Sequence, residues 1–136
     1  MIVIKNDIIP FDGYKAISIW PFIFVRKDCS FNEIDRNHEE IHGRQQVEMT
    51  IIGAIQSVIL FFAGLGWWSL CPLTFFYAWY ITEWLIRCFI DDYPYRSISF
   101  EQEAYGNEKN LEYLGYRKYF AWVRYLTSSY HYKRPI

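Results

Sequence analysis

The chain has 136 residues and a formal net charge of −1, a size that allows one domain, residues 1–136. It contains no basic stripe and no aromatic–basic repeat, which argues against a nucleic-acid partner. Aromatic residues make up 21% of the chain, a share that suits a protein with membrane interfaces to line. From Met49 to Thr82, 34 consecutive positions carry no charged residue. We therefore expect a mainly α-helical membrane protein.

Residues 1–27 are expected to form a β-rich N-terminal segment. Ile2-Val3-Ile4 is a short β-branched run, and Asp12-Gly13 is a turn signal. Two further β-rich runs between Tyr14 and Val25 are interrupted by Trp20-Pro21. This pattern predicts a small hairpin or an edge strand. The first residues lack the basic start and long apolar core of a secretory signal, so insertion would depend on the internal apolar block.

Residues 31–63 are predicted to form one helix that enters the apolar block. Ser30-Phe31-Asn32-Glu33 resembles a capping box at its start, and neither Pro nor Gly interrupts the run from Phe31 to His42. The helix is expected to continue past Gly43, with a bend there or at Gly53. Gly64-Leu65-Gly66 interrupts the block, and a second helix is expected over residues 67–90, with Pro72 in its first turns. Because about 20 residues cross a membrane, the two helices together predict a transmembrane hairpin.

Basic residues lie on both flanks of this hairpin, whereas the turn at Gly64 to Trp68 carries none. The positive-inside rule then places both termini on the cytoplasmic side of the inner (cytoplasmic) membrane. Cys29, Cys71 and Cys88 have no metal-type or redox-type spacing, so we expect free thiols.

Residues 97–136 are expected to hold C-terminal helices. A third helix is predicted from Ser99 to Leu114, ending at Gly115, and a fourth from Arg117 to Leu126. In the preceding apolar helix, Glu83 and Arg87 are spaced i, i+4, and we expect a structural ion pair.

His38-Glu39-Glu40-Ile41-His42 is an H-E-x-x-H motif. On a helix, positions i and i+4 differ by about 40° in azimuth, so two imidazoles can reach one metal ion from the same face. Glu39 would then lie close enough to act as general base on a zinc-activated water. The motif predicts a Zn²⁺ site with His38 and His42 as ligands and Glu39 as the catalytic residue.

Two histidines do not complete a catalytic zinc site, so a third ligand is needed. Glu101 and Glu103 lie on the next predicted helix about 200° apart, so only one of them can face the metal. We take Glu101 as the third ligand and Glu103 as the alternative. If Glu101 is the ligand, Glu103 is expected to behave as a surface helix position.

Other polar residues have weaker claims on the site. Gln45 shares a helical face with the two histidines and could support them, while Gln46 and Glu48 are expected to pack or pair elsewhere. Tyr105, Tyr130 and His131 are candidates for polarising a substrate carbonyl.

An H-E-x-x-H helix joined to membrane helices and followed by this downstream segment resembles the HtpX-type and CAAX prenyl-protease-type gluzincins. Ser97, Phe100, Glu101 and Ala104 match the family's second motif, in which the residue at the Glu101 position is the zinc ligand. Tyr105 stands where the family has Asp, which removes a carboxylate that usually supports the site. The resemblance implies a zinc metallopeptidase, and zincins often place a β-strand beside the zinc helix.

The chain is also similar to a set of small membrane proteins with N-H-E-x-I-H-x-x-Q-Q-x-E and F-E-x-E-A-Y-x-N-E segments. Here these segments are residues 37–48 and 100–108. The similarity implies a shared site without assigning an activity to it.

Two functions follow as hypotheses. The first is an integral-membrane zinc metallopeptidase that hydrolyses membrane-associated peptides or proteins near the cytoplasmic surface, with membrane lipid around it. The second is a non-catalytic adaptor, in which a structural zinc stabilises a subunit of a larger membrane complex. A third, weaker alternative is a zinc-free membrane protein with an accidental motif. Whether Glu39 is free or held in a salt bridge distinguishes the first two.

Overall fold

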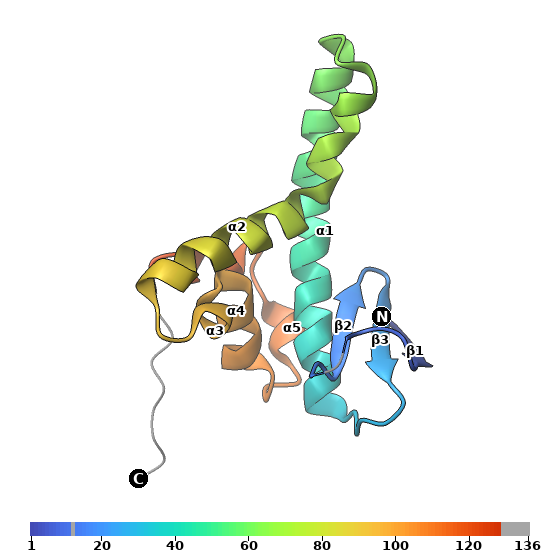
Figure 1. Ribbon diagram of the computed structural model, residues 1–136, viewed down its shortest axis with the longest axis vertical. Coiled ribbons are helices and arrows are strands. Elements are labelled where there is room, and N and C mark those ends of the chain that lie inside the picture. Colours follow the sequence, from blue (N-terminus) through green and yellow to red (C-terminus); the bar gives the residue numbers. More distant parts are fainter. Residues whose placement is uncertain (12, 129–136) are drawn as a thin grey trace.

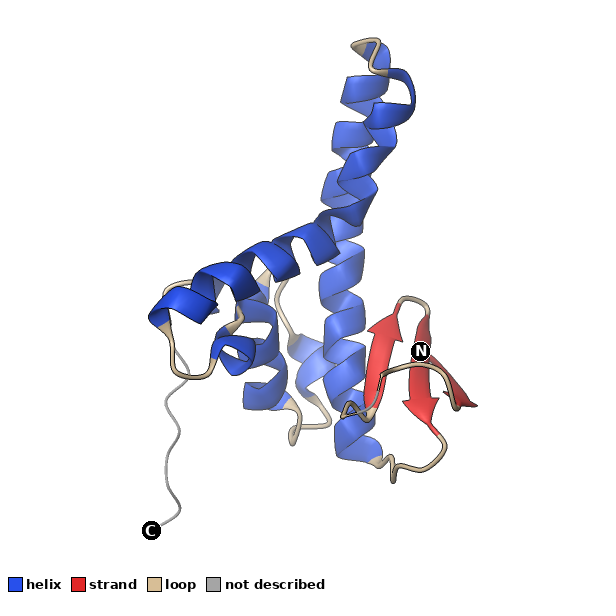
Figure 2. Ribbon diagram, in the orientation of Figure 1, coloured by secondary structure: helices blue, strands red, loops and turns tan. Residues whose placement is uncertain are grey.

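The computed structural model describes residues 1–11 and 13–128 of the chain (Figure 1). It is mainly helical, with a small three-stranded sheet formed by the N-terminal segment (Figure 2). This confirms the expected mix of helices and a small β element. The elements in chain order are β1 Ile2–Asn6, β2 Ala16–Ile19, β3 Phe22–Arg26, α1 Glu33–Phe62, η1 Gly66–Thr74, α2 Phe75–Ile90, α3 Pro94–Ser97, α4 Ser99–Asn107, α5 Tyr113–Tyr116 and η2 Ala121–Tyr125.

The sheet has the order β1-β3-β2, with β1 parallel and β2 antiparallel to β3. β2 and β3 form the expected hairpin, and Trp20-Pro21 provides its turn. Gln46 of α1 ties this hairpin to the helix, because its amide donates to the Ser18 carbonyl (2.8 Å) and accepts from the Trp20 N–H (2.7 Å). β2 therefore lies directly beside the helix that carries the two histidines.

α1 is a continuous helix of 30 residues. Its N-cap is Asn32, which forms a reciprocal capping box with Asp35. The predicted start at Phe31 and the predicted box from Ser30 to Glu33 were therefore displaced by two residues. Asn32 takes the cap because its extended backbone directs its side chain at the N–H of Asp35.

The apolar block was predicted correctly as two limbs, and the first limb is the expected long helix. The prediction of one continuous helix over residues 67–90 was wrong. α1 forms the first limb, and the second consists of η1, a 3₁₀ helix, followed by α2, which turns away from α1 (Figure 1). Gly53 allows the close approach of η1, because a Cβ there would lie 2.1 Å from the Pro72 carbonyl oxygen. Pro72 lies inside η1, where a 3₁₀ segment accommodates it. By length and composition one helix, α1, qualifies as a membrane span among the described residues.

The C-terminal helices are shorter than predicted. The helix expected from Ser99 to Leu114 ends at Asn107 and is followed by the short α5, while the expected fourth helix is the 3₁₀ segment η2. A core of buried apolar side chains joins α4 to α1, α2 and η2. Its members are Met49, Phe76, Ile98, Phe100 and Trp122, with Ile41, Ala104 and Tyr113 in a neighbouring cluster. This packing holds α4 against the lower half of α1.

Candidate metal centre

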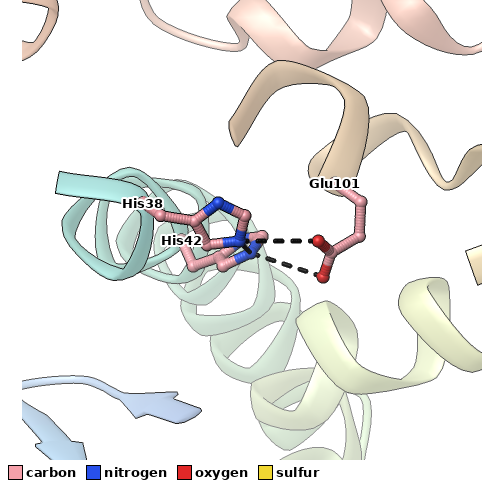
Figure 3. Close-up of side chains that lie close together, drawn as sticks. All are labelled: His38, His42 and Glu101. Atoms are coloured by element: carbon pink, nitrogen blue, oxygen red, sulfur yellow. Dashed lines mark hydrogen bonds and ion pairs between the residues drawn. The ribbon is translucent and has the colours of Figure 1, made fainter. Parts of the chain in front are cut away.

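His38 and His42 project from α1 toward the carboxylate of Glu101 on α4 (Figure 3). The two Nε2 atoms lie 3.1 Å apart. His42 Nε2 lies 3.4 Å from Glu101 Oε1, and His38 Nε2 lies 3.6 Å from Glu101 Oε2. These three side chains form a group that could hold a metal ion.

Both imidazoles are held through their Nδ1 atoms by acceptors. His38 Nδ1 lies 2.9 Å from Glu108 Oε2, and His42 Nδ1 lies 2.8 Å from Gln45 Oε1. A carboxylate and an amide oxygen both accept, so each Nδ1 carries a proton, and the neutral form of each imidazole has its lone pair on Nε2. Two lone pairs facing each other at 3.1 Å repel unless a cation or proton lies between them. The histidines are thus oriented as ligands.

The orientation of the Gln45 amide follows from its own partners. Its Nε2 donates to the Phe100 carbonyl (3.1 Å) and to Glu103 Oε2 (3.0 Å). Since both partners are acceptors, the NH₂ group must point toward them and the oxygen toward His42. Gln45 therefore holds the His42 imidazole through this hydrogen bond, as expected from the sequence.

The separations between the imidazole nitrogens and the carboxylate oxygens are compatible with a small metal ion. Zinc binds nitrogen at about 2.0–2.1 Å and carboxylate oxygen at about 2.0–2.2 Å. Neighbouring ligands of a regular tetrahedron with such bonds lie about 3.3–3.6 Å apart. The two Nε2 atoms are 3.1 Å apart, and His42 and His38 lie 3.4 and 3.6 Å from the Oε1 and Oε2 atoms of Glu101, respectively. One ligand atom from each of the three residues lies within 4.8 Å of the other two. The residues therefore fit a zinc-sized cation with a fourth position left over.

Glu101 is a buried carboxylate with one satisfied oxygen. Its Oε1 accepts a hydrogen bond from the Tyr80 hydroxyl at 2.7 Å. Its Oε2 is buried without a hydrogen-bond partner among the described residues. Burial alone would raise the pKa of Glu101, but the adjacent imidazoles of His42 and His38 outweigh it and hold the pKa well below its usual range. An unsatisfied, ionised oxygen in this position favours a cation at the centre.

Glu103 faces away from this centre, as the 200° spacing requires, but it is not a surface residue. Its side chain is fully buried and pairs with Arg117, whose Nε and Nη2 lie 2.5 and 3.1 Å from its two oxygens. The Tyr113 hydroxyl donates to it at 2.8 Å, and Arg117 also pairs with Glu48. The expected surface position was wrong, because α5 and the segment after it cover this face of α4.

Glu39 lines a cavity of about 260 Å³ beside the two histidines and Glu101. Its side chain is largely buried, yet within residues 1–11 and 13–128 its carboxylate makes no hydrogen bond or ion pair. The remaining walls are mostly apolar and come from the N-terminal loop, β2, α1, α2 and α3. Their residues are Pro10, Phe11, Tyr14, Ala16, Ile17, Ser18, Gln46, Phe76, Tyr77, Tyr80 and Tyr95.

Among the other candidate residues that the structure describes, Tyr105 does not line the cavity. The Tyr105 ring packs edge-on against His38, with centroids 4.7 Å apart, and burial followed by the charge of Glu101 raises its pKa to about 12. Tyr130 and His131 lie outside the described residues. Glu83 and Arg87 form the expected buried ion pair at 3.2 Å.

Three partners of the site were not predicted. Glu108 holds His38, Tyr80 holds Glu101, and Asn37 donates to the carbonyls at the end of α4, including Glu108 O at 2.8 Å. Glu108 lies seven residues after Glu101, on the same face of a helix, which was a signal for its role. No comparable signal existed for Tyr80, which comes from a different element.

Comparison of the chain with protein-family models, with curated proteins and with solved structures gives no match.

Proposed function

We propose that this chain is an integral-membrane zinc metallopeptidase of the gluzincin type, which hydrolyses peptide bonds near the cytoplasmic membrane surface. One observation carries the proposal. The Nε2 atoms of two histidines and the Oε2 atom of Glu101, which has no hydrogen-bond partner among the described residues, face one another. The carboxylate of Glu39 lies beside them in a cavity.

His38, His42 and Glu101 would hold the zinc, and Glu108 and Gln45 would keep the imidazoles in the ligating tautomer. Bound zinc would supply a Lewis acid that polarises the substrate carbonyl and acidifies water at its open position. Glu39 accepts the proton of the attacking water and returns it to the leaving amine. The cavity walls beside Glu39 position the peptide, and their apolar side chains reduce its contact with bulk water.

The free state of Glu39 favours this function over the adaptor. In a structural zinc site the coordination is closed by four protein ligands, and no base is required beside it. Here the described residues offer three ligands and leave the side toward the cavity open.

The test compares Glu39→Gln with Glu40→Gln in detergent-purified protein. Glu40 is the neighbouring carboxylate on the same helix, but it pairs with Arg36 at 2.9 Å and does not line the cavity. Zinc content is measured by elemental analysis, and cleavage is measured on a panel of membrane-associated peptides. We expect Glu39→Gln to keep its zinc and lose about 10²–10⁴ in rate, while Glu40→Gln retains both.

Equal turnover in wild type and Glu39→Gln would contradict the role of the base. A zinc-loaded wild type that cleaves no peptide of the panel would instead support the adaptor.

A further inference from the structure

The upper part of α1 and the antiparallel η1 form an apolar hairpin that projects from the folded body (Figure 1). From Thr50 onward most α1 side chains are exposed, except along one stripe that includes Gly53, which packs against η1. The large ones include Ile51, Ile55, Val58, Ile59, Phe61 and Phe62. Apolar side chains that are exposed over most of the circumference of a helix are suited to lipid rather than to a single protein groove.

The hairpin is too short to cross a bilayer. The 13 residues from Thr50 to Phe62 rise about 20 Å at 1.5 Å per residue. The nine residues of η1 rise about 18 Å at 2.0 Å per residue. The two limbs have nearly the same length, and both are well short of the hydrocarbon thickness of about 30 Å. The tip therefore reaches slightly beyond the middle of the bilayer.

The rest of α1 cannot add to the span. Below Thr50 its buried side chains are largely polar and belong to the folded body, among them His42, Gln45 and Glu48. These groups are committed to the site and to the Arg117 network. The whole of α1 is long enough to cross a membrane, but its lower half packs within the folded body, so only its upper half is available to enter lipid.

α2 continues from the hairpin along the body, with two different faces. Its inward face carries the buried Glu83 and Arg87. Its outward face carries exposed apolar side chains, with Leu85 at 50% and Phe89 at 88% exposure. A helix with this division lies in the plane of a membrane surface, with its apolar side toward the acyl chains.

We propose that the chain is monotopic: the hairpin enters the bilayer from one side and ends near its middle, and α2 lies along the surface of the leaflet that the hairpin enters. The occupant of the apolar surface is lipid. The surface runs without interruption from the hairpin onto the outer face of α2, and the charges of α2 that the structure places point inward. The cavity, whose wall includes Phe76, Tyr77 and Tyr80 from the start of α2, then opens just below the membrane surface. The inference rests on the proposed membrane insertion but not on the proposed hydrolysis.

Spin-label depth measurements test this arrangement. Single cysteines are placed at Ile51, Val58 and Leu65, with the native Cys88 as a fourth site and the other cysteines replaced by serine. Each labelled protein is reconstituted into phospholipid vesicles, and label depth is obtained from its relative accessibility to oxygen and to a water-soluble nickel complex. The label at Val58 is expected about 10 Å deeper than the label at Ile51. The label at Leu65 is expected to be deepest, and the label at Cys88 to lie near the headgroups.

Two results would overturn the proposal. A Leu65 label shallower than the Val58 label would mean that the tip emerges on the far side, as in a transmembrane hairpin. Full access of the nickel complex to all four labels would mean that lipid does not cover the surface and that a protein partner does. Zinc content measured on the same samples separates either failure from a failure of the metal site.

Discussion

Substitution of Glu103 by alanine distinguishes a buried support of the metal centre from a surface helix position. Glu103 has no exposed surface and accepts hydrogen bonds from Arg117, Tyr113 and Gln45. Its removal leaves a buried guanidinium with one carboxylate partner, Glu48, in place of two. It also removes one of the two acceptors that orient the Gln45 amide toward His42.

Breaking a buried ion pair from one side costs about 3–5 kcal/mol. Because Glu48 still pairs with Arg117, we expect the lower end, about 3 kcal/mol, for the metal-free protein. Loss of a group that orients a metal ligand weakens metal binding by about 10–100-fold. Glu101→Ala removes a proposed ligand itself, so its loss of zinc affinity should exceed that range.

Denaturant unfolding of metal-free protein in detergent measures the first quantity, and competition with a zinc-binding dye measures the second. Glu112→Ala is the matched control, because Glu112 is an exposed carboxylate in the same part of the chain and should change stability by no more than about 0.5 kcal/mol. If Glu103→Ala unfolds like Glu112→Ala, the buried network carries no stability and the reasoning fails. If Glu103→Ala loses more zinc than Glu101→Ala, the two carboxylates have been assigned in the wrong order.

Three further predictions concern the metal, the hairpin and the topology. Elemental analysis should find one zinc per wild-type chain and almost none in His42→Ala, since two ligands cannot retain the ion; equal contents would disprove the site. Gly53→Leu should destabilise the protein by about 1–3 kcal/mol in thermal unfolding, because any Cβ at this position meets the Pro72 carbonyl oxygen. Gly115→Ala, with open space around it, is the control, and an equal effect of both substitutions would mean that the close packing of η1 is unimportant. Cysteines added at the two chain ends should resist impermeant reagents applied to intact cells, and ready labelling would reverse the proposed orientation.

The amino-acid sequence by itself was sufficient for the features that depend on local spacing. The i, i+4 separation brings His38 and His42 onto one face wherever that helix forms, and the structure has them 3.1 Å apart at Nε2. The two-residue separation of Glu101 and Glu103 likewise sends them to opposite faces of α4. The long uncharged block was enough to predict an apolar hairpin with its turn at Gly64 to Gly66.

The tertiary structure alone decided what covers each face and how far each element extends. Helical periodicity assigns Glu103 to a face but does not say that Arg117 and Tyr113 will bury it, since those residues arrive from a later part of the chain. The second limb became a 3₁₀ segment and a separate helix, with Pro72 inside the first and Gly53 packed against it. The free length of the hairpin also depends on how much of α1 the body covers. Such features arise from contacts between residues distant in sequence. The free energy of burial that favours them depends on these contacts, so a local sequence pattern cannot predict them.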